Sequence, residues 1–517
     1  GLSQGNNIIR WTVTAEGVGC TNQDNVTIVN NTGTTANAGP DITTSSGTAI
    51  MQANTPTVGT GEWSCLSCPG TIAITDPSSP TTTITGLSET YPTAELRWTI
   101  TYAAGGCSAS SDDAFAYYDP DELGFVLSGH LNNTGGFVQT NDPNYFIMTG
   151  QAHGTSTLIT GEDATYTDAK LRVKGSKITY DGSISSGKFD KTWVQGGANF
   201  DIDDGKTFKN NDFLNAGTLS LGTASIIENS GDWTNSNTVT AGTSNIIFNG
   251  TESQDIYGGS SNYYDITVNN SGDGLNLTSE LIVGNELTMT QGNITTTDAN
   301  ILTIGTGTGN LGTVSRTDGI VYGPMKRWFA DATNSGTASS LFPIGHPDVA
   351  SNYLPAMIEY SSAPTTGGTL TAKVMAEIMG YIDSHVEIPA DGSCPEFHIT
   401  SLSWQAFWRF NATDLEGGAY DITLNPNGFQ VITELCQLTA LKHTDESSSW
   451  EAPGTHVAPS GTIDSPVVKR SGIDSGFSDW GLAGGNPNML PVELLDFYAN
   501  CNDNIIDLEW ITATEFN

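Results

Sequence analysis

The chain has 517 residues, with 56 Asp and Glu against 18 Lys and Arg and a formal net charge of −38. A chain this acidic repels nucleic acid and anionic lipid, so we expect neither as a partner. Thr and Val favour strands, and the abundant Gly and Asn favour the tight turns between them, so the composition predicts an all-β fold. Because no apolar run approaches the roughly 18 residues that a membrane-spanning helix needs, we expect no membrane span.

An internal repeat organises the N-terminal part of the chain. Two stretches carry the same signatures in the same order, namely Gly1-Leu2-Ser3, Arg10-Trp11-Thr12 and Gly19-Cys20, then Gly86-Leu87-Ser88, Arg97-Trp98-Thr99 and Gly106-Cys107. The offset is 85 residues at the Gly-Leu-Ser signature (1 to 86) and 87 at the tryptophan (11 to 98). A period of this size fits tandem β-sandwich domains, and we expect Trp11 and Trp98 to pack in their cores.

The complete copy of the repeat carries more specific motifs. It begins with Asn37-Ala38-Gly39-Pro40-Asp41 and continues through Gly59-Thr60-Gly61-Glu62-Trp63 to Pro80-Thr81-Thr82-Thr83. This succession resembles the immunoglobulin-like repeats of Bacteroidota surface proteins, which serve as stalk or spacer modules. The resemblance implies that residues 36–118 form an immunoglobulin-like domain and that residues 1–35 are the last strands of a partial one.

The cysteine usage favours an oxidising compartment. There are seven cysteines in a turn-rich β sequence, of which Cys65 and Cys68 form a CxxC pair. Zinc needs four ligands, and no second pair stands at a finger-like spacing. We therefore expect a disulfide from Cys65 or Cys68 to Cys107.

The pattern in residues 119–328 predicts a parallel β-solenoid. Short β runs such as Thr218-Leu219-Ser220-Leu221 and Ile246-Ile247-Phe248 recur between Gly, Asn or Asp turns. Their spacing of roughly 18 to 24 residues is that of one coil of a parallel β-helix. Because a single coil cannot bury its inward face, successive coils are expected to stack into a rod. The segment 249–294 also resembles β-helix regions of Bacteroidota adhesin-like proteins.

A window of the predicted solenoid suggests a different function. It holds eight of the 18 basic residues, namely Lys170, Arg172, Lys174, Lys177, Lys188, Lys191, Lys206 and Lys209. Lysine-bearing β-helices include polysaccharide lyases, in which a base abstracts a proton near a carboxylate. The same window holds Asp181, Asp190, Asp201, Asp203 and Asp204, so a solvated, ion-paired surface is the alternative. Convergence of the bases with Asp190, Asp201 and Asp203 in one cleft would indicate a polysaccharide-binding or polysaccharide-cleaving protein.

The only cofactor that the sequence suggests is a calcium ion. Asp201, Asp203 and Asp204 lie in one short acidic turn, and carboxylate oxygens are suitable ligands for Ca²⁺. The turn lacks the rest of an EF-hand loop, so a purely structural turn is the alternative interpretation.

No catalytic constellation is found elsewhere, so we do not expect an enzyme. The stretch Gly307-Thr308-Gly309-Asn310-Leu311-Gly312 fits GxGxxG, but a nucleotide site needs a helix after the glycines. Thr, Val and Gly follow instead, which predicts a solenoid turn. The seven histidines are scattered along the chain.

Residues 329–489 are expected to form a C-terminal β-sandwich that caps the rod. Its aromatic residues, for example Phe407-Trp408-Arg409-Phe410, are predicted to lie in its core, and Cys394 and Cys436 are plausible disulfide partners. Residues 490–517 then begin a further β domain. This last stretch resembles the segment that precedes the sorting domain in cargo of the Bacteroidota type IX secretion system, which implies secretion by that route.

Both ends of the sequence therefore carry pieces of β domains. Cys20 and Cys501 lack obvious local partners, and we expect them to meet across a junction between subunits. Strands at one end of a subunit would then complete the other end of the next, and a head-to-tail contact that does not close generates a filament. The sequence thus predicts an extracellular structural protein of the cell surface, an adhesin or a filament subunit forming a homopolymer. A surface glycan or cell receptor is the other expected partner.

Overall fold

The computed structural model describes residues 5–14, 20–30, 33–68, 70–88, 91–102, 109–118, 124–128, 130–133, 137–138, 145–149, 156–160, 165–166, 169–175, 177–182, 186–331, 340–349, 352–376, 386–429, 432–443, 449–485, 494–502 and 505–512. The chain divides into two compact units, Gly1–Phe125 and Val126–Asn517, which are described separately below. About 58% of the chain is strand, and the predicted all-β fold and parallel β-solenoid are both confirmed. In the part of the chain that is described, no helix is long and apolar enough to cross a membrane.

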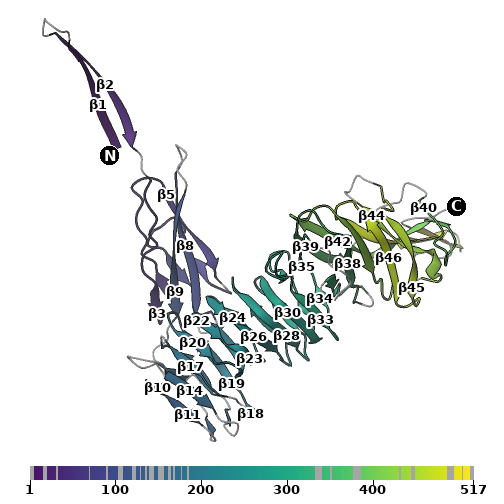
Figure 1. Ribbon diagram of the computed structural model, residues 1–517, viewed down its shortest axis with the longest axis horizontal. Coiled ribbons are helices and arrows are strands. Elements are labelled where there is room, and N and C mark those ends of the chain that lie inside the picture. Colours follow the sequence, from purple (N-terminus) through teal and green to yellow (C-terminus); the bar gives the residue numbers. More distant parts are fainter. Residues whose placement is uncertain are drawn as a thin grey trace. The chain divides into compact units, whose positions relative to one another are not determined.

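The first unit begins with a two-stranded antiparallel hairpin of β1 (Gly5–Thr14) and β2 (Thr21–Asn30) (Figure 1). Two sheets follow. The first has the strand order β3 (Ile42–Thr44), β9 (Ser110–Tyr118), β8 (Thr93–Thr101) and β5 (Thr60–Ser67), and the second has the order β4 (Thr48–Ile50), β7 (Thr83–Thr85) and β6 (Ala73–Ile74). The two sheets share one hydrophobic core. Its immunoglobulin-like character remains a prediction.

Trp63 and Trp98 form the centre of this core. Their ring centroids are 5.3 Å apart, and both side chains are buried. The bare backbone of Gly61 lies against the Trp98 indole, where a Cβ would come within 2.1 Å of the ring. A glycine at this position therefore allows the large aromatic ring to pack flat on the neighbouring strand. The prediction that Trp98 is a core residue is confirmed.

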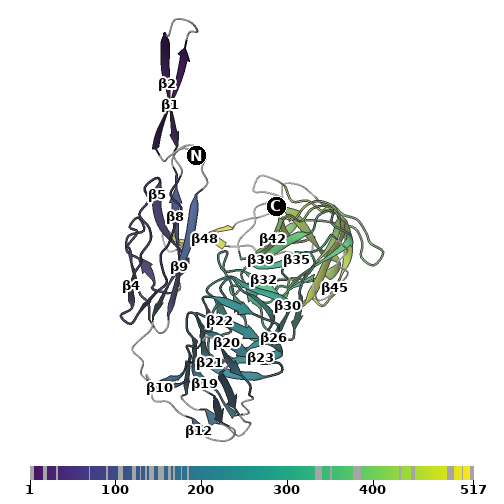
Figure 2. The ribbon, with the colours of Figure 1, turned by 60° about the vertical axis from the view of Figure 1, so that its left-hand side comes forward.

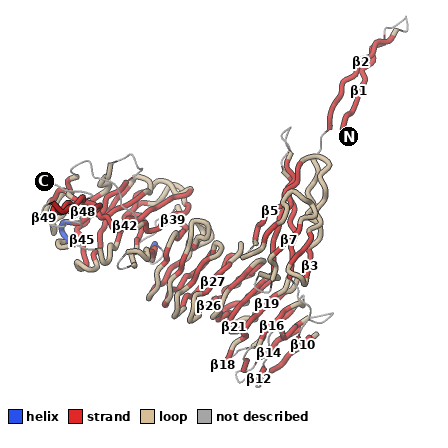
Figure 3. The backbone as a smooth tube through the Cα atoms, turned by 180° about the vertical axis from the view of Figure 1, so that it is seen from behind, coloured by secondary structure: helices blue, strands red, loops and turns tan. Residues whose placement is uncertain are grey.

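The second unit begins with about eight coils of parallel β-solenoid, whose strands lie side by side from coil to coil (Figures 1 and 3). One face consists of β11 (Leu131–Asn133), β14 (Ser156–Thr160), β17 (Ile178–Tyr180), β20 (Asn199–Ile202), β22 (Thr218–Leu221) and β25 (Thr238–Thr240). A second face begins with β12 (Phe137–Val138), β15 (Thr165–Tyr166) and β18 (Ser186–Gly187) and continues with β23 (Thr223–Asn229) and β26 (Thr243–Phe248).

The third face runs through β10 (Gly124–Leu127), β13 (Tyr145–Met148), β16 (Lys170–Val173), β19 (Phe189–Val194), β24 (Trp233–Asn235), β27 (Gln254–Tyr257), β29 (Leu275–Leu277), β31 (Ile294–Thr295) and β34 (Val321–Tyr322). Three longer strands, β21 (Thr207–Asn215), β28 (Asn262–Asn269) and β30 (Leu281–Gln291), each pair with strands on two faces. Aligned residues such as Phe200 and Leu219 are 19 positions apart, as expected for one coil.

The interior of the coils is apolar. At its buried corners, the side-chain amides of asparagines form hydrogen bonds. Asn215 donates to the Asn235 side chain over 2.8 Å, and Asn235 donates in turn to the Gly258 carbonyl over 3.0 Å. Each amide thus bonds to the next coil, which satisfies polar groups that burial would otherwise penalise. The frequent asparagines of the sequence therefore fix the stacking as well as the turns.

The solenoid passes into the C-terminal β-sandwich through a shared strand, β35 (Met325–Phe329). On one side β35 pairs in parallel with β32 (Leu302–Ile304), and on the other it pairs antiparallel with β39 (Gly368–Met375). The domain boundary predicted after residue 328 thus falls inside a strand that belongs to both parts. The register pairs β32, β35, β39 and β42 (Ser401–Thr413) in this order, and Figure 2 draws these strands close together.

The sandwich is built from two antiparallel sheets, whose main core is continuous with that of the solenoid, and a smaller separate cluster includes Leu441 and Trp450. One continues from β39 through β42 (Ser401–Thr413) and β47 (Asp479–Gly484) to β44 (Leu438–His443). The other has the order β36 (Leu341–Phe342), β38 (Ala356–Ser362), β43 (Ala419–Leu424), β46 (Pro466–Ile473) and β45 (Thr455–Gly461). Phe407, Trp408 and Phe410 are buried, as predicted. A last hairpin pairs β48 (Leu494–Asn502) with β49 (Ile505–Thr512).

Candidate functional site

The basic residues of the solenoid window do not gather in one place. Lys170, Arg172 and Lys191 lie on the third face, whereas Lys209 lies on the part of β21 that pairs with β23 of the second face. The others occupy turns: Lys174 and Lys177 lie between β16 and β17, Lys188 lies between β18 and β19, and Lys206 lies between β20 and β21. The acidic partners are separated as well, because Asp190 lies on β19 and Asp201 on β20.

Most of these charges have local partners within the rod. Lys206 pairs with Asp181 at 2.7 Å, Lys209 with Glu228 at 3.5 Å, and Lys188 donates to Asn211 at 3.2 Å. Arg172 is buried, with its guanidinium 4.5 Å from the centroid of the Trp193 ring. Among the described residues, the window therefore supplies ion pairs between neighbouring coils, Lys206 with Asp181 and Lys209 with Glu228.

The calcium candidate is an exposed turn after β20. Asp203 and Asp204 are exposed, and a carboxylate oxygen of Asp204 accepts a hydrogen bond from the Thr223 amide over 2.6 Å. Partial desolvation of this exposed carboxyl, together with the nearby charges of Asp181 and Asp204, raises the pKa of Asp203. Within the described residues, no three His, Cys, Asp or Glu side chains form a group that could hold a metal ion, and Asp201, Asp203 and Asp204 are no exception.

The cysteines form two disulfides, one predicted and one not. Cys394 and Cys436 are bonded, with Cα atoms 5.1 Å apart, as predicted. Cys65 is bonded to Cys68 at a Cα separation of 5.9 Å, so the expected disulfide from this pair to Cys107 is wrong. The ladder between β5 and β8 changes register between Cys65 and Ser67. This irregularity at the end of β5 accompanies the local pairing, and Cys107 itself lies outside the described residues.

Cys20 and Cys501 were predicted to meet between subunits. Cys20 is exposed and forms no disulfide with another cysteine of the described residues. Cys501 lies on β48, opposite Ile506 in the backbone ladder. Their pairing across a junction stays a prediction.

A column of aspartates on the third face was not anticipated from the sequence. An Asp212 carboxylate oxygen accepts from the backbone amide of Asp232 over 3.0 Å, and Asp232 accepts in the same way from Asp255 over 2.9 Å. Burial raises the pKa of both Asp212 and Asp232. The spacing of 20 and 23 residues between these aspartates is the only sequence signal, and it becomes visible once the coil length is known.

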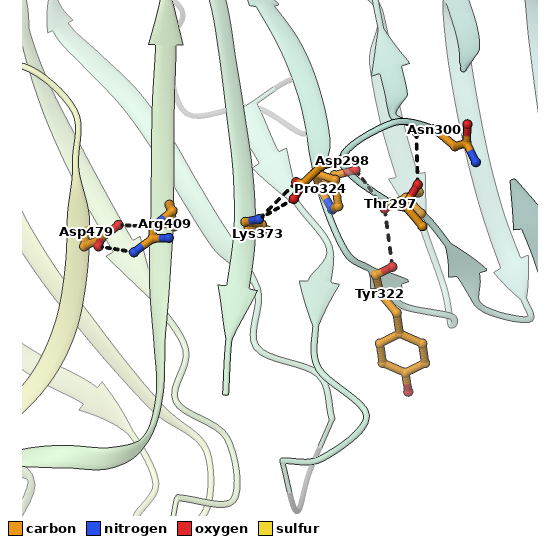
Figure 4. Close-up of polar contacts among 9 residues, drawn as sticks. Thr297, Asp298, Asn300, Tyr322, Pro324, Lys373, Arg409 and Asp479 are labelled. Carbon is orange, nitrogen blue, oxygen red and sulfur yellow. Dashed lines mark hydrogen bonds and ion pairs between the residues drawn. The ribbon is translucent and has the colours of Figure 1, made fainter. Parts of the chain in front are cut away.

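Polar contacts also join the last coils to the sandwich (Figure 4). The Lys373 ammonium group on β39 donates to both carboxylate oxygens of Asp298, at 2.9 and 3.1 Å, from the turn after β31. The Thr296 hydroxyl donates to the Pro324 carbonyl over 2.9 Å. Inside the sandwich, Arg409 forms a two-point ion pair with Asp479, with both distances at 2.8 Å. Of these contacts, the Lys373–Asp298 pair crosses the junction, where β35 already joins the two parts.

The β1–β2 hairpin presents an apolar face to solvent. Trp11 is 73% exposed, so the prediction that it is a core residue is wrong for this structure. Exposed apolar side chains accompany it on both strands: Ile9, Val13, Val26 and Ile28.

No family model matches the chain, and no curated protein matches it.

Proposed function

We propose that the protein is a secreted structural component of the bacterial cell surface, acting as an adhesin or as a subunit of an extracellular filament. The observation that carries this proposal is the solenoid itself: the basic residues of the Lys170–Lys209 window lie on different faces and turns, and Lys206 and Lys209 pair with acidic residues of neighbouring coils. A rod of this kind would act as a mechanical spacer and would not catalyse a reaction. The two disulfides are compatible with an oxidising, extracellular compartment.

The Bacteroidota resemblances of the repeat, the β-helix segment and the C-terminal stretch support the same proposal. They favour export by the type IX route and display outside the outer membrane. The test is protease treatment of intact cells of the source, followed by detection of this chain. Degradation by added protease is expected, with a periplasmic protein as the intact control. Protection of the chain until the cells are lysed would refute the surface location.

Head-to-tail self-association is the form of assembly that we propose for a filament. The exposed Cys20, which forms no disulfide within the described part of the chain, supports it, with Cys501 of the next subunit as the expected partner. A Cys20→Ser variant should lose reductant-sensitive oligomers on a non-reducing gel. An alanine substitution at Cys65 and Cys68 together is the matched control, because that pair is already satisfied within its own chain.

The alternative from the sequence, a polysaccharide-binding or polysaccharide-cleaving β-helix protein, depended on convergence of the Lys170–Lys209 window. In the described part of the window these bases lie on different faces and turns, which supports the structural proposal over this alternative. The remaining test is direct: acidic polysaccharides incubated with the protein should show no change in chain length and no unsaturated uronate absorbance. Cleavage that disappears in a Lys191→Ala variant would restore this alternative.

A further inference from the structure

The β1–β2 hairpin repeats the geometry of the β8–β9 hairpin residue by residue. Trp11 pairs with Asp24 across β1 and β2, and Trp98 pairs with Asp112 across β8 and β9. The neighbouring arginines repeat as well. Arg97 donates to Asp113 over 2.8 Å, and Arg10 donates to Asn25, one residue beyond Asp24, over 3.1 Å. The two hairpins are therefore the same structural piece of two repeats.

The two hairpins differ in whether their apolar face is covered. On β8 and β9, the side chains of Leu96, Trp98, Ile100, Ala114 and Ala116 are all 0% exposed. The register aligns these residues with Ile9, Trp11, Val13, Val26 and Ile28, which are exposed by 46%, 73%, 52%, 57% and 39%. A two-stranded hairpin with such a face is at best marginally stable in water.

The complete repeat shows what covers this face. The core beneath β8 and β9 includes Ala49 of β4, Ile84 of β7 and Met51, all from the residues that precede β8 in the sequence. Gly86, at the start of the connection to β8, lies so close to this preceding half that a Cβ would come within 2.2 Å of the Thr71 carbonyl. Leu87 of the same connection is 4% exposed and belongs to the core.

We propose that the apolar face of β1–β2 is a docking surface for a β half-domain of the same kind as residues 33–85, continuous in sequence with the hairpin. The Gly-Leu-Ser connection before each hairpin indicates that the covering half-domain belongs to the same polypeptide. The identities of Gly86-Leu87-Ser88 recur as Gly1-Leu2-Ser3 before the first hairpin, with 10 residues from Gly1 to Trp11 (1 to 11) against 12 from Gly86 to Trp98 (86 to 98). In the complete repeat these residues are needed because the covering half reaches β8 through them. A separate partner would give no reason for the connection to be repeated.

The aligned side chains also define the shape of the occupant. Val26 and Ile28 stand where the complete repeat has Ala114 and Ala116, so the covering half must carry smaller side chains opposite β2. Residues 33–85 of this chain would therefore be overpacked against the hairpin by several methylene groups. The inference goes beyond the proposed function, and it assigns covering of this face to the same polypeptide rather than to the tail of another subunit.

The test places an extra copy of residues 33–85 directly before Gly1 of the full chain. Oxidative labelling with mass spectrometry then compares the modification rate of Trp11 with that of Trp98. In the unextended chain, Trp11 should react much faster than Trp98 at every protein concentration. In the extended chain carrying Val26→Ala and Ile28→Ala, which restore the side chains of the complete repeat, the rate at Trp11 should fall to that of Trp98.

Two controls keep the result decisive. The same added residues in scrambled order should leave Trp11 reactive, and the extended chain without the alanine substitutions should show intermediate protection. If Trp11 reacts equally fast in every extended chain, the proposed docking surface is wrong. If the unextended chain instead protects Trp11 as its concentration rises, a second copy covers the face, and the proposed source is wrong although the surface is real.

Discussion

Trp233 and Tyr263 are joined by a hydrogen bond in the interior of the solenoid. The indole Nε1 of Trp233 donates to the Tyr263 hydroxyl over 3.0 Å, and that hydroxyl donates to the Gly258 carbonyl over 2.9 Å. Both side chains are buried, and burial raises the pKa of Tyr263. The Trp233 ring also stacks on Phe213 with centroids 4.7 Å apart. One residue thus ties the aromatic interior of successive coils together.

Trp233→Ala should lower the free energy of unfolding by about 3 to 5 kcal/mol, because it removes a buried aromatic ring and leaves a cavity. Trp233→Phe keeps the ring stack and should cost less, about 1 to 3 kcal/mol, since the Tyr263 hydroxyl loses its donor. Urea unfolding followed by far-ultraviolet circular dichroism measures both. Trp11→Ala, at an exposed position, should change stability by less than about 0.5 kcal/mol. Equal effects at the two tryptophans would contradict the assignment of Trp233 to the core.

His456 should make the C-terminal sandwich less stable in mild acid. Burial, reinforced by the nearby Arg470, lowers the pKa of His456 in the folded state. Below the unfolded pKa of about 6.5, the unfolded chain binds a proton that the native state does not, so stability falls as pH drops from there toward the folded pKa. Above that range both states are neutral, and this contribution to the pH dependence vanishes.

The free energy of unfolding is measured at about five pH values between about pH 7.5 and pH 5, the range in which protonation of His456 is expected to change stability. His456→Gln should flatten the decline. His398→Gln, at an exposed histidine on a short strand of the same region, should leave the slope of the wild-type protein unchanged. The same slope in the wild-type protein and in His456→Gln would show that His456 does not control it.

Asp212→Asn should stabilise the solenoid at neutral pH, by less than about 1 kcal/mol. Burial raises the pKa of Asp212, so its ionised form is disfavoured in the folded state and stability falls as pH rises through that folded pKa. Asparagine keeps an oxygen that accepts from the Asp232 amide and carries no charge to desolvate. Thermal unfolding at pH 7 measures the gain, with exposed Asp273→Asn as the matched control. A lower transition temperature for Asp212→Asn than for the control would contradict this explanation.

The two disulfides should differ in how much they stabilise the fold. The bond from Cys394 to Cys436 closes a sequence separation of 42 residues, whereas Cys65 to Cys68 closes one of 3. Loop-closure entropy then gives about 4 kcal/mol for the first and about 2 kcal/mol for the second. Replacing each pair by alanines and following denaturant unfolding of the corresponding part tests this order. A larger loss for the Cys65–Cys68 pair would overturn it.

The sequence was sufficient for the all-β class and for the solenoid because the signals of the solenoid are local and repeated. Apolar runs such as Ile246-Ile247-Phe248 recur at the length of one coil, with Gly and Asn at the corners, and this periodicity alone defines a stacked solenoid. Gly307–Gly312 also lies in the predicted turn, with an isolated bridge between Gly307 and Asn310. Repetition turns weak local preferences into a reliable pattern.

The errors concern features that depend on which segments meet in space. The Cys65–Cys68 bond could be predicted only with knowledge of the register change at the end of β5, which no residue type indicates. Trp11 has the same sequence context as Trp98, yet its exposure depends on a covering half that local sequence cannot supply. The Asp212 column likewise became visible only through the alignment of coils. Side-chain identity gave the chemistry of these residues, and the fold determined their neighbours.

Electron microscopy of the protein released from the surface of its source, with and without reductant, tests the structural account most directly. The account predicts regular fibres in oxidising buffer that break into shorter pieces when Cys20 is released from its partner. Separate particles of constant length in both buffers would contradict the filament, provided that the protein densely covers the cell surface from which it was released. The protein would then be a monomeric adhesin, and its receptor would be the next question.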